Sequence, residues 1–237
     1  MLGGAQDQLL SSLPPLPPPH VNTQRMESAG GICFVLSTIA GVNVVSYSVV
    51  HSFNTLPPAV YSAFQMVMSF LSAVALFCLC GVQLADPGVV KRTVANCFPQ
   101  PEAVAALLEA GGAASDLCNF KGTHHGMHMS FCVRCFVWRP GHGHHCNTCQ
   151  RCVTHFDHHC GVLGRCIAGE GLRGNLNTFF HPLLCCAMAG IWSGIGFAIY
   201  AAVLWEIQRD KHQGAAPGNG SLNGTNATGL LMYSRTG

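Results

Sequence analysis

Charged residues are scarce in this chain. Only 9% of its 237 residues are Asp, Glu, Lys or Arg, whereas 49% are hydrophobic, and the formal net charge is +2. Soluble domains usually carry about a quarter of their residues as charges, so the composition points away from an ordinary soluble protein. The small net charge also gives no basis for binding nucleic acid through bulk electrostatics, and no nucleic-acid partner is expected. A lipid bilayer is the first environment to consider.

Long uncharged runs take the place of charge. Residues 30–50, 59–85 and 182–205 contain no charged side chain. About 20 residues of α-helix cross the hydrocarbon core of a bilayer, so each run predicts a transmembrane helix. The first run includes Asn43 and several serines, which leaves a buried soluble helix as an alternative for that segment. The fold class predicted from these runs is an all-α, multi-pass membrane protein with three transmembrane helices.

Basic residues gather between the second and third runs. Residues 86–181 hold eight of the 12 Lys and Arg residues. Basic loops tend to stay in the cytoplasm, so the segment is predicted to be cytoplasmic. We divide it into a linker over residues 86–131 and a loop-rich cysteine-rich domain over residues 132–180.

The two terminal segments lack long apolar runs. Residues 1–29 include the run LPPLPPP and are expected to form a disordered, proline-rich tail. With three spans and a cytoplasmic loop, residues 206–237 become a lumenal tail. Three N-glycosylation sequons agree with that side of the membrane, at Asn219, Asn223 and Asn226.

Cysteine and histidine are concentrated in one short stretch. Seven of the 14 cysteines fall within residues 132–166, interleaved with histidines. Imidazole has no place in a disulfide framework and is a preferred zinc ligand, and a reducing cytoplasm also disfavours disulfides. The stretch therefore predicts zinc, with ligands enough for two tetrahedral ions, although spacing alone does not identify the cysteine left for chemistry. His124, His125 and His128 lie outside the pattern and are expected to be exposed loop residues.

The spacing within residues 132–166 is similar to that of the cysteine-rich domain of DHHC-type protein S-acyltransferases, also called palmitoyltransferases. Residues 157–160 read DHHC. Residues 86–88 resemble the DPG motif of that family, and Asn175 with Phe179 fits its Asn-xxx-Phe element.

The resemblance implies two structural zinc ions and a free cysteine. The first ion would be bound by Cys132, Cys135, His145 and Cys152. The second would be bound by Cys146, Cys149, His159 and Cys166. The catalytic residues implied by the resemblance are Cys160 as nucleophile, His158 as general base and Asp157 as the carboxylate that orients the imidazole.

The resemblance also implies a reaction. A long-chain acyl group would pass from palmitoyl-CoA, the co-substrate, to Cys160, and from this acyl-enzyme to cytoplasmic cysteines of membrane-associated proteins. The spans would hold the acyl chain in the bilayer, and residence in the Golgi or the endoplasmic reticulum is the family-level expectation.

Three departures from the family pattern keep alternatives open. Residues 161–165 read GVLGR where the family usually has Pro-Trp and Asn residues, and the interval between Ile167 and Asn175 is longer than usual. A fourth span and the TTxE motif are missing after residue 205, which fits a fragment or a truncated isoform. A catalytically impaired, zinc-binding membrane scaffold is therefore the alternative function. A RING-like ubiquitin ligase is a third, but its ligand spacing differs and it would leave the DHHC aspartate and first histidine without a role.

Overall fold

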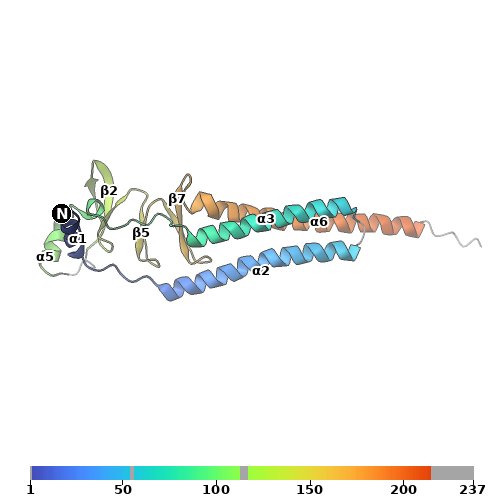
Figure 1. Ribbon diagram of the computed structural model, residues 1–237, viewed down its shortest axis with the longest axis horizontal. Helices are drawn as coiled ribbons and strands as arrows, with labels where there is room; N and C mark the ends of the chain where they lie inside the picture. The colour runs from blue at the N-terminus through green and yellow to red at the C-terminus, as the bar shows by residue number, and fades with distance from the viewer. Residues whose placement is uncertain (1, 54–55, 113–116, 215–237) are drawn as a thin grey trace, which may run out of the picture.

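Three long helices define the long axis of the molecule. The computed structural model describes residues 2–53, 56–112 and 117–214. The long helices are α2 (Val21–Phe53), α3 (Pro58–Leu84) and α6 (His181–Gly214). They lie together at one end, with α2 and α6 running away from a region of short strands and α3 returning to it (Figure 1). By length and composition each is able to cross a membrane, which confirms the prediction of three long apolar helices.

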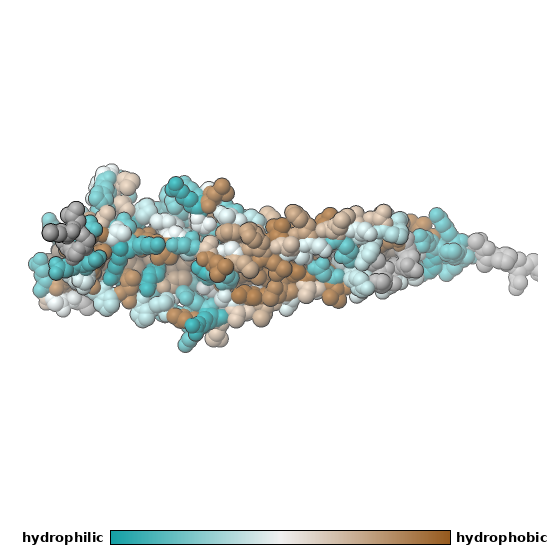
Figure 2. Space-filling model, in the orientation of Figure 1, coloured by the Kyte–Doolittle hydropathy of each residue, from teal (hydrophilic) through white to brown (hydrophobic). Residues whose placement is uncertain are grey.

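Each long helix packs against the others through one face, and its remaining faces expose apolar side chains. On α3, the buried residues Met68, Ala75 and Val82 recur at helical spacing, and Phe64 stacks on Phe197 of α6 with ring centroids 3.7 Å apart. Many large apolar side chains point outward, and Figure 2 shows apolar surface over the middle of the helices. A soluble monomer rarely exposes so continuous an apolar surface, whereas helices in contact with lipid do.

The DPG turn ends α3 and directs the chain onto the cysteine-rich region. The Asp86 carboxylate accepts hydrogen bonds from the backbone N–H groups of Gly88 and Val89, both at 2.9 Å. Gly88 has φ 98°, a conformation that a side chain would strain. Its carbonyl accepts from the N–H of Thr154 at 2.9 Å, just after strand β5 (Arg151–Val153). The segment that follows α3 is therefore fixed against the cysteine-rich region.

The prediction that this region is loop-rich within an all-α fold is wrong. After the short helices α4 (Val94–Cys97) and α5 (Glu102–Glu109), the described chain forms three small antiparallel sheets. The first contains β1 (Phe120–His124), β2 (Met127–Cys132) and β3 (Val137–Pro140). The second pairs β4 (His144–Cys146) with β5, and the third contains β6 (Phe156–Cys160), β7 (Arg165–Glu170) and β8 (Arg173–Gly174). The strands therefore begin at Phe120, before the predicted start of the cysteine-rich domain at residue 132.

A repeated turn explains these hairpins. Three times, the backbone N–H four residues after a cysteine donates to the carbonyl oxygen of that cysteine, and the donating residue has φ between 52° and 64°. The donors are Phe136, Gln150 and Gly164, and the acceptors are Cys132, Cys146 and Cys160, at 2.7–2.8 Å. Each turn reverses the chain, so the segments that flank it pair as antiparallel strands. Cysteine spacing therefore produces strands without the usual apolar alternation.

The N-terminal segment differs from the predicted disordered tail. It contains α1 (Leu2–Ser11), and α2 begins at Val21, well before the predicted start at residue 30. The proline-rich run between them lies along the cysteine-rich region, where Arg151 donates to the carbonyl oxygen of Pro17 at 2.8 Å. Prolines have no N–H groups but keep free carbonyl oxygens, so arginines can hold this run in an extended form.

At the other end, α6 continues to Gly214, beyond the predicted end at residue 205. The three sequons of the predicted lumenal tail, Asn219, Asn223 and Asn226, lie outside the described residues.

Candidate metal centres and a free cysteine

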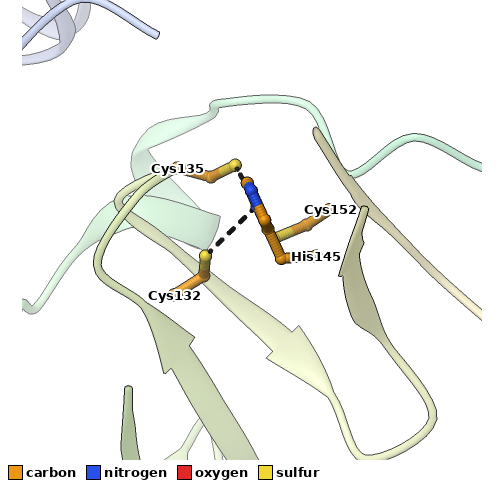
Figure 3. Close-up of side chains that lie close together, drawn as sticks. All are labelled: Cys132, Cys135, His145 and Cys152. Atoms are coloured by element: carbon orange, nitrogen blue, oxygen red, sulfur yellow. Dashed lines mark hydrogen bonds between the residues drawn. The ribbon is translucent and has the colours of Figure 1, made fainter. Parts of the chain in front are cut away.

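Four side chains meet between the first two sheets. The ligand atoms of Cys132, Cys135, His145 and Cys152 all lie within 4.8 Å of one another, and all four residues are buried (Figure 3). The Nδ1 atom of His145 is 3.6 Å from the sulfur of Cys132, 3.3 Å from that of Cys135 and 3.8 Å from that of Cys152.

A second group of the same composition lies between the second and third sheets. It consists of Cys146, Cys149, His159 and Cys166, also with ligand atoms within 4.8 Å of one another. The Nδ1 atom of His159 is 3.5 Å from two of the sulfurs and 3.8 Å from the third. His145 and Cys146 are neighbours in β4 yet belong to different groups, because successive side chains of a strand point to opposite faces.

Both groups fit a tetrahedral zinc ion. Ligand atoms bound to one zinc at about 2.0–2.3 Å are separated from each other by about 3.5–3.8 Å. The nitrogen–sulfur separations in the two groups are 3.3–3.8 Å. None of the cysteines in the described ranges forms a disulfide. The groups bring together the two sets of residues that the family resemblance implies as zinc ligands.

The electrostatics of the first group also indicate a cation. Hydrogen bonds from Cys135 and Cys152 hold the pKa of the Cys132 thiol well below its ordinary value, while hydrogen bonds with Cys132 and Cys135 raise the pKa of Cys152. Burial opposes a charge on His145, but its hydrogen bonds to Cys132 and Cys135 outweigh burial and raise its pKa to about 9. Without a metal only part of the thiols can ionise, whereas a divalent cation accommodates all of them.

Two acceptors that the sequence did not reveal fix the imidazoles. The Nε2 atom of His159 lies 3.1 Å from a carboxylate oxygen of Glu27 on α2, and Nε2 of His145 lies 3.3 Å from the side-chain oxygen of Gln150. Each ring therefore directs Nδ1 to the sulfurs and can donate its Nε2–H to an acceptor, the arrangement usual for a metal-bound histidine. Glu27 lies 132 residues before His159 in the chain, so no local spacing pattern could have indicated it.

Cys160 belongs to neither group. It ends β6, where His159 pairs with Cys166 across the strands, so the next side chain points to the opposite face of the sheet. Its relative exposure is 9%, and it lines a cavity of about 390 Å³ between α2, α3 and α6. Apolar side chains from each helix also line this cavity, including Val35, Ala75 and Leu183.

His158 contacts Phe180 in the wall of this cavity, and Asp157 contacts the His158 ring. Nδ1 of His158 is 2.9 Å from a carboxylate oxygen of Asp157, and both side chains are partly exposed. The His158 ring meets Phe180 edge-on at 5.5 Å, and Phe180 lines the cavity with Cys160. Within the described ranges no hydrogen bond joins the His158 ring to the Cys160 sulfur. The structure thus puts the three side chains on neighbouring positions of one strand, with the imidazole oriented by the carboxylate.

Asn175 connects the second group to α6. It is fully buried, accepts from the N–H of Ala168 at 3.0 Å and donates to the carbonyl oxygen of Cys166 at 3.0 Å. It precedes the π-helical turn η2 (Leu176–Phe180) that leads into α6. Within this turn Phe179 packs directly against Gly81 of α3, where a Cβ atom would overlap the ring. The position of a cluster cysteine and the packing of the helices are therefore linked.

The segment that departs from the family pattern packs against α2. At Gly31 an added Cβ atom would overlap the carbonyl oxygen of Val162, and at Gly164 it would overlap that of Gln24. Gln83 of α3 donates to the carbonyl oxygen of Leu163 at 3.1 Å. The GVLGR segment is thus a fixed wall between the cysteine-rich region and the helices.

One expectation about the unmatched histidines is wrong. His124 is buried, hydrogen-bonds to the carbonyl oxygen of Ala95 at 2.7 Å and stacks on Trp138 with ring centroids 5.0 Å apart. It ends strand β1, which pairs with β2 at the edge of the first sheet and which the sequence pattern did not predict. His125 and His128 are exposed, as expected, but His128 lies in strand β2 and not in a loop.

Comparison with known proteins agrees with this geometry. Residues 125–232 match the family model described as DHHC palmitoyltransferase. Palmitoyltransferase PFA3 of Debaryomyces hansenii is 35% identical over 81 residues, which cover 34% of this chain and 18% of that protein. Palmitoyltransferase Hip14 of Drosophila melanogaster is 28% identical over 155 residues, 65% of this chain and 22% of that protein.

A third relative, Probable protein S-acyltransferase 15 of Arabidopsis thaliana, is 28% identical over 130 residues, 55% of this chain and 42% of that protein. The matches span less than half the length of each of these relatives. Over residues 125–232, which contain both Cys–His groups, the chain is similar to DHHC-type protein S-acyltransferases.

Proposed function

We propose that this chain acts as a protein-cysteine S-acyltransferase, transferring a long-chain acyl group from palmitoyl-CoA to cysteines of membrane-associated proteins. One observation carries the proposal. Cys160 lies outside both Cys–His groups and lines an apolar cavity between three helices long enough to span a membrane. The match of residues 125–232 to the DHHC palmitoyltransferase family model supports the class of reaction.

The two Cys–His groups are proposed to hold one structural zinc ion each. Bound zinc would cross-link the strands and keep the ligand thiolates ionised. The sharing of β4 between the groups then makes the cysteine-rich region one braced unit. Glu27 and Gln150 would fix the orientation of the two histidine ligands. The strand that supplies His159 to the second group ends at Cys160, so this bracing also sets the position of the proposed nucleophile.

The proposed reaction has two transfers. His158 takes the proton of the Cys160 thiol, and Asp157 orients the ring and stabilises its protonated form. The Cys160 thiolate attacks the carbonyl carbon of the acyl-CoA thioester, a new sulfur–carbon bond forms, and the bond to the CoA sulfur breaks. The CoA thiolate leaves with the proton from the imidazolium. A substrate cysteine, deprotonated in the same way, then attacks the acyl-enzyme thioester and releases Cys160.

The cavity is suited to the acyl chain. Apart from the Cys160 thiol, its lining is made mainly of aliphatic and aromatic side chains from the three helices. Each methylene removed from water contributes about 0.8 kcal/mol, so a long saturated chain is bound strongly without specific polar contacts. The Cys160 sulfur at the sheet end of the cavity would receive the carbonyl carbon, while the chain extends between α2, α3 and α6.

The proposed orientation places the cysteine-rich region in the cytoplasm. The N-terminal segment lies at the same end as the cysteine-rich region, and α6 ends at the opposite end (Figure 1). With the basic region between α3 and α6 in the cytoplasm, Cys160 would face acyl-CoA and the cytoplasmic cysteines of substrates. Golgi or endoplasmic reticulum membranes are the proposed residence.

A labelling experiment tests the proposal. Purified chain in detergent is incubated with an alkyne analogue of palmitoyl-CoA and assayed by click chemistry. We expect a hydroxylamine-sensitive label on the wild type and on Cys118→Ser, an exposed-cysteine control, but not on Cys160→Ser. Unlabelled wild-type protein that retains two zinc ions would reject the transferase and favour the scaffold. Label that persists in Cys160→Ser would reject Cys160 as the acceptor.

A further inference from the structure

A second cavity lies beside the first, at the junction of the helices with the cysteine-rich region. Its volume is about 590 Å³. The start of α2, the end of α3 and strands β5 and β7 form its walls, and three arginines line it, Arg25, Arg151 and Arg165. No Asp or Glu is among the lining residues. Three cationic side chains from three separate elements thus meet around one opening.

The charges of these arginines are not neutralised within the described part of the chain. None of the three forms an ion pair there. Arg151 donates to the carbonyl oxygens of Pro17 and Gln150, and Arg165 donates to that of Ala85 at 3.1 Å. These carbonyl contacts hold the two guanidinium groups in place and leave their positive charges uncompensated.

The level of this cavity is that of lipid headgroups. Gln83, at the end of the apolar helix α3, and Pro87 of the turn that follows line it, together with Ile32 of α2. Figure 2 shows polar surface giving way to apolar surface between the cysteine-rich region and the helices. If the helices span a bilayer, as proposed above, the arginines lie where its phosphate groups begin.

We propose that this cavity binds the phosphate headgroup of an anionic phospholipid from the cytoplasmic leaflet. A planar guanidinium binds phosphate oxygens in pairs, and basic pockets between helices at the cytoplasmic boundary suit such headgroups. The apolar residues Val21, Ala29 and Ile32 of the lining face the same opening and would contact the glycerol and upper acyl part of the lipid.

The bound lipid would brace the acyl cavity. The GVLGR segment separates the two cavities, since Val162 and Leu163 line the first and Gly164 and Arg165 line the second. A phosphate held by Arg25 of α2 and by the arginines of β5 and β7 would tie α2 to the cysteine-rich region. Because α2 also forms one wall of the acyl cavity, the lipid would stabilise that wall.

The rival explanation is local charge compensation. Cys149 and Cys166 also line this cavity, so the arginines could serve only to balance cluster thiolates. The two explanations differ in what happens to zinc. Lipid binding requires Arg25 without affecting the metal content, whereas charge compensation predicts that loss of an arginine releases metal.

The test uses the full chain, purified with zinc in a non-ionic detergent. Binding of dihexanoyl phosphatidic acid is compared with that of dihexanoyl phosphatidylcholine by native mass spectrometry, and the zinc content is read from the same spectra. The variants are Arg25→Gln, Arg25→Lys and, as a matched control, Arg173→Gln, an exposed arginine of β8 outside the cavity.

We expect phosphatidic acid to bind the wild type more tightly than phosphatidylcholine, and Arg25→Gln to weaken it about fivefold with zinc unchanged. Arg25→Lys should lose less, Arg173→Gln should behave as wild type, and added salt should weaken binding. Equal affinity for the two lipids, an equal loss in Arg173→Gln, or loss of zinc in Arg25→Gln would overturn the proposal. Displacement of phosphatidic acid by free CoA would overturn it too, because the cavity would then be part of the acyl-CoA site. None of these readouts depends on acyl transfer, so they are separate from the test of the proposed function.

Discussion

Replacing Asn175 by alanine tests whether the second Cys–His group and the helices are held by one buried side chain. The substitution leaves the N–H of Ala168 and the carbonyl oxygen of Cys166 without their partners, at positions that are almost completely buried. Each unsatisfied buried polar group costs about 1–3 kcal/mol, so we expect a loss of about 2–4 kcal/mol, allowing for partial relaxation. Because Cys166 belongs to the second group, metal should also dissociate from that group more readily.

The assay combines thermal unfolding in detergent with the rate of zinc release to a colorimetric chelator. Asn177→Ala is the matched control, because Asn177 makes one exposed contact, to His181 at 2.9 Å. Asn175→Asp keeps the acceptor and loses the donor, and should fall between alanine and wild type. If Asn175→Ala and Asn177→Ala changed the midpoint and the release rate equally, the proposed link between the group and the helices would be refuted.

Three further substitutions test other parts of the account. Ala187→Phe places a ring in the acyl cavity, so labelling should shift toward shorter acyl-CoA chains, whereas Ala189→Phe on the outer face of α6 should not shift it. Glu27→Leu removes the acceptor for His159, so the affinity of one of the two zinc ions should fall about 10–100-fold in a competition with chelators. His158→Ala should slow acylation of Cys160 by about 100-fold in single-turnover kinetics, because the thiol would lose its proposed base.

Controls separate these effects from general destabilisation. Glu102→Leu and His128→Ala alter exposed residues away from both Cys–His groups, and should leave zinc affinity and acylation unchanged. Unchanged chain-length preference in Ala187→Phe would reject the cavity as the acyl site. Equal loss of zinc in Glu27→Leu and Glu102→Leu would reject Glu27 as the partner that fixes His159.

The long helices were predictable because the property that forms them is continuous along the sequence. An uncharged run of more than 20 residues marks a helix of membrane length whatever its partners are. The predicted ends of the helices were less accurate than their existence. Helix α2 begins at Val21 and α6 continues to Gly214, because a helix can extend past its apolar part into polar residues.

The strands were not predictable from apolar alternation. Strands such as β4 and β5 have three residues each and contain cysteine or histidine where a buried apolar residue would usually mark the inner face. Their pairing follows from the turns that begin at Cys132, Cys146 and Cys160. The cysteine spacing therefore does contain information about these hairpins. On its own, however, this spacing indicates metal ligands more directly than it indicates strands.

Partners from distant parts of the chain were the main omission. Glu27 lies in a segment expected to be disordered, and nothing near it in the sequence indicates contact with His159. The proline-rich run appeared unstructured because it lacks apolar periodicity, yet Arg92 and Arg151 hold its carbonyl oxygens. Such contacts depend on the folded arrangement of the cysteine-rich region, which a single sequence does not specify.

The mass of single molecules after one turnover decides whether Cys160 accepts an acyl group while both Cys–His groups hold zinc. Zinc-loaded protein is mixed with palmitoyl-CoA, and native mass spectrometry, followed by fragmentation, counts zinc ions and locates the acyl group. We expect molecules that carry two zinc ions and one acyl group on Cys160, and Cys160→Ser molecules that carry two zinc ions and no acyl group. An acyl group that appears only on molecules that have lost zinc, or on a cysteine of either Cys–His group, would contradict this expectation.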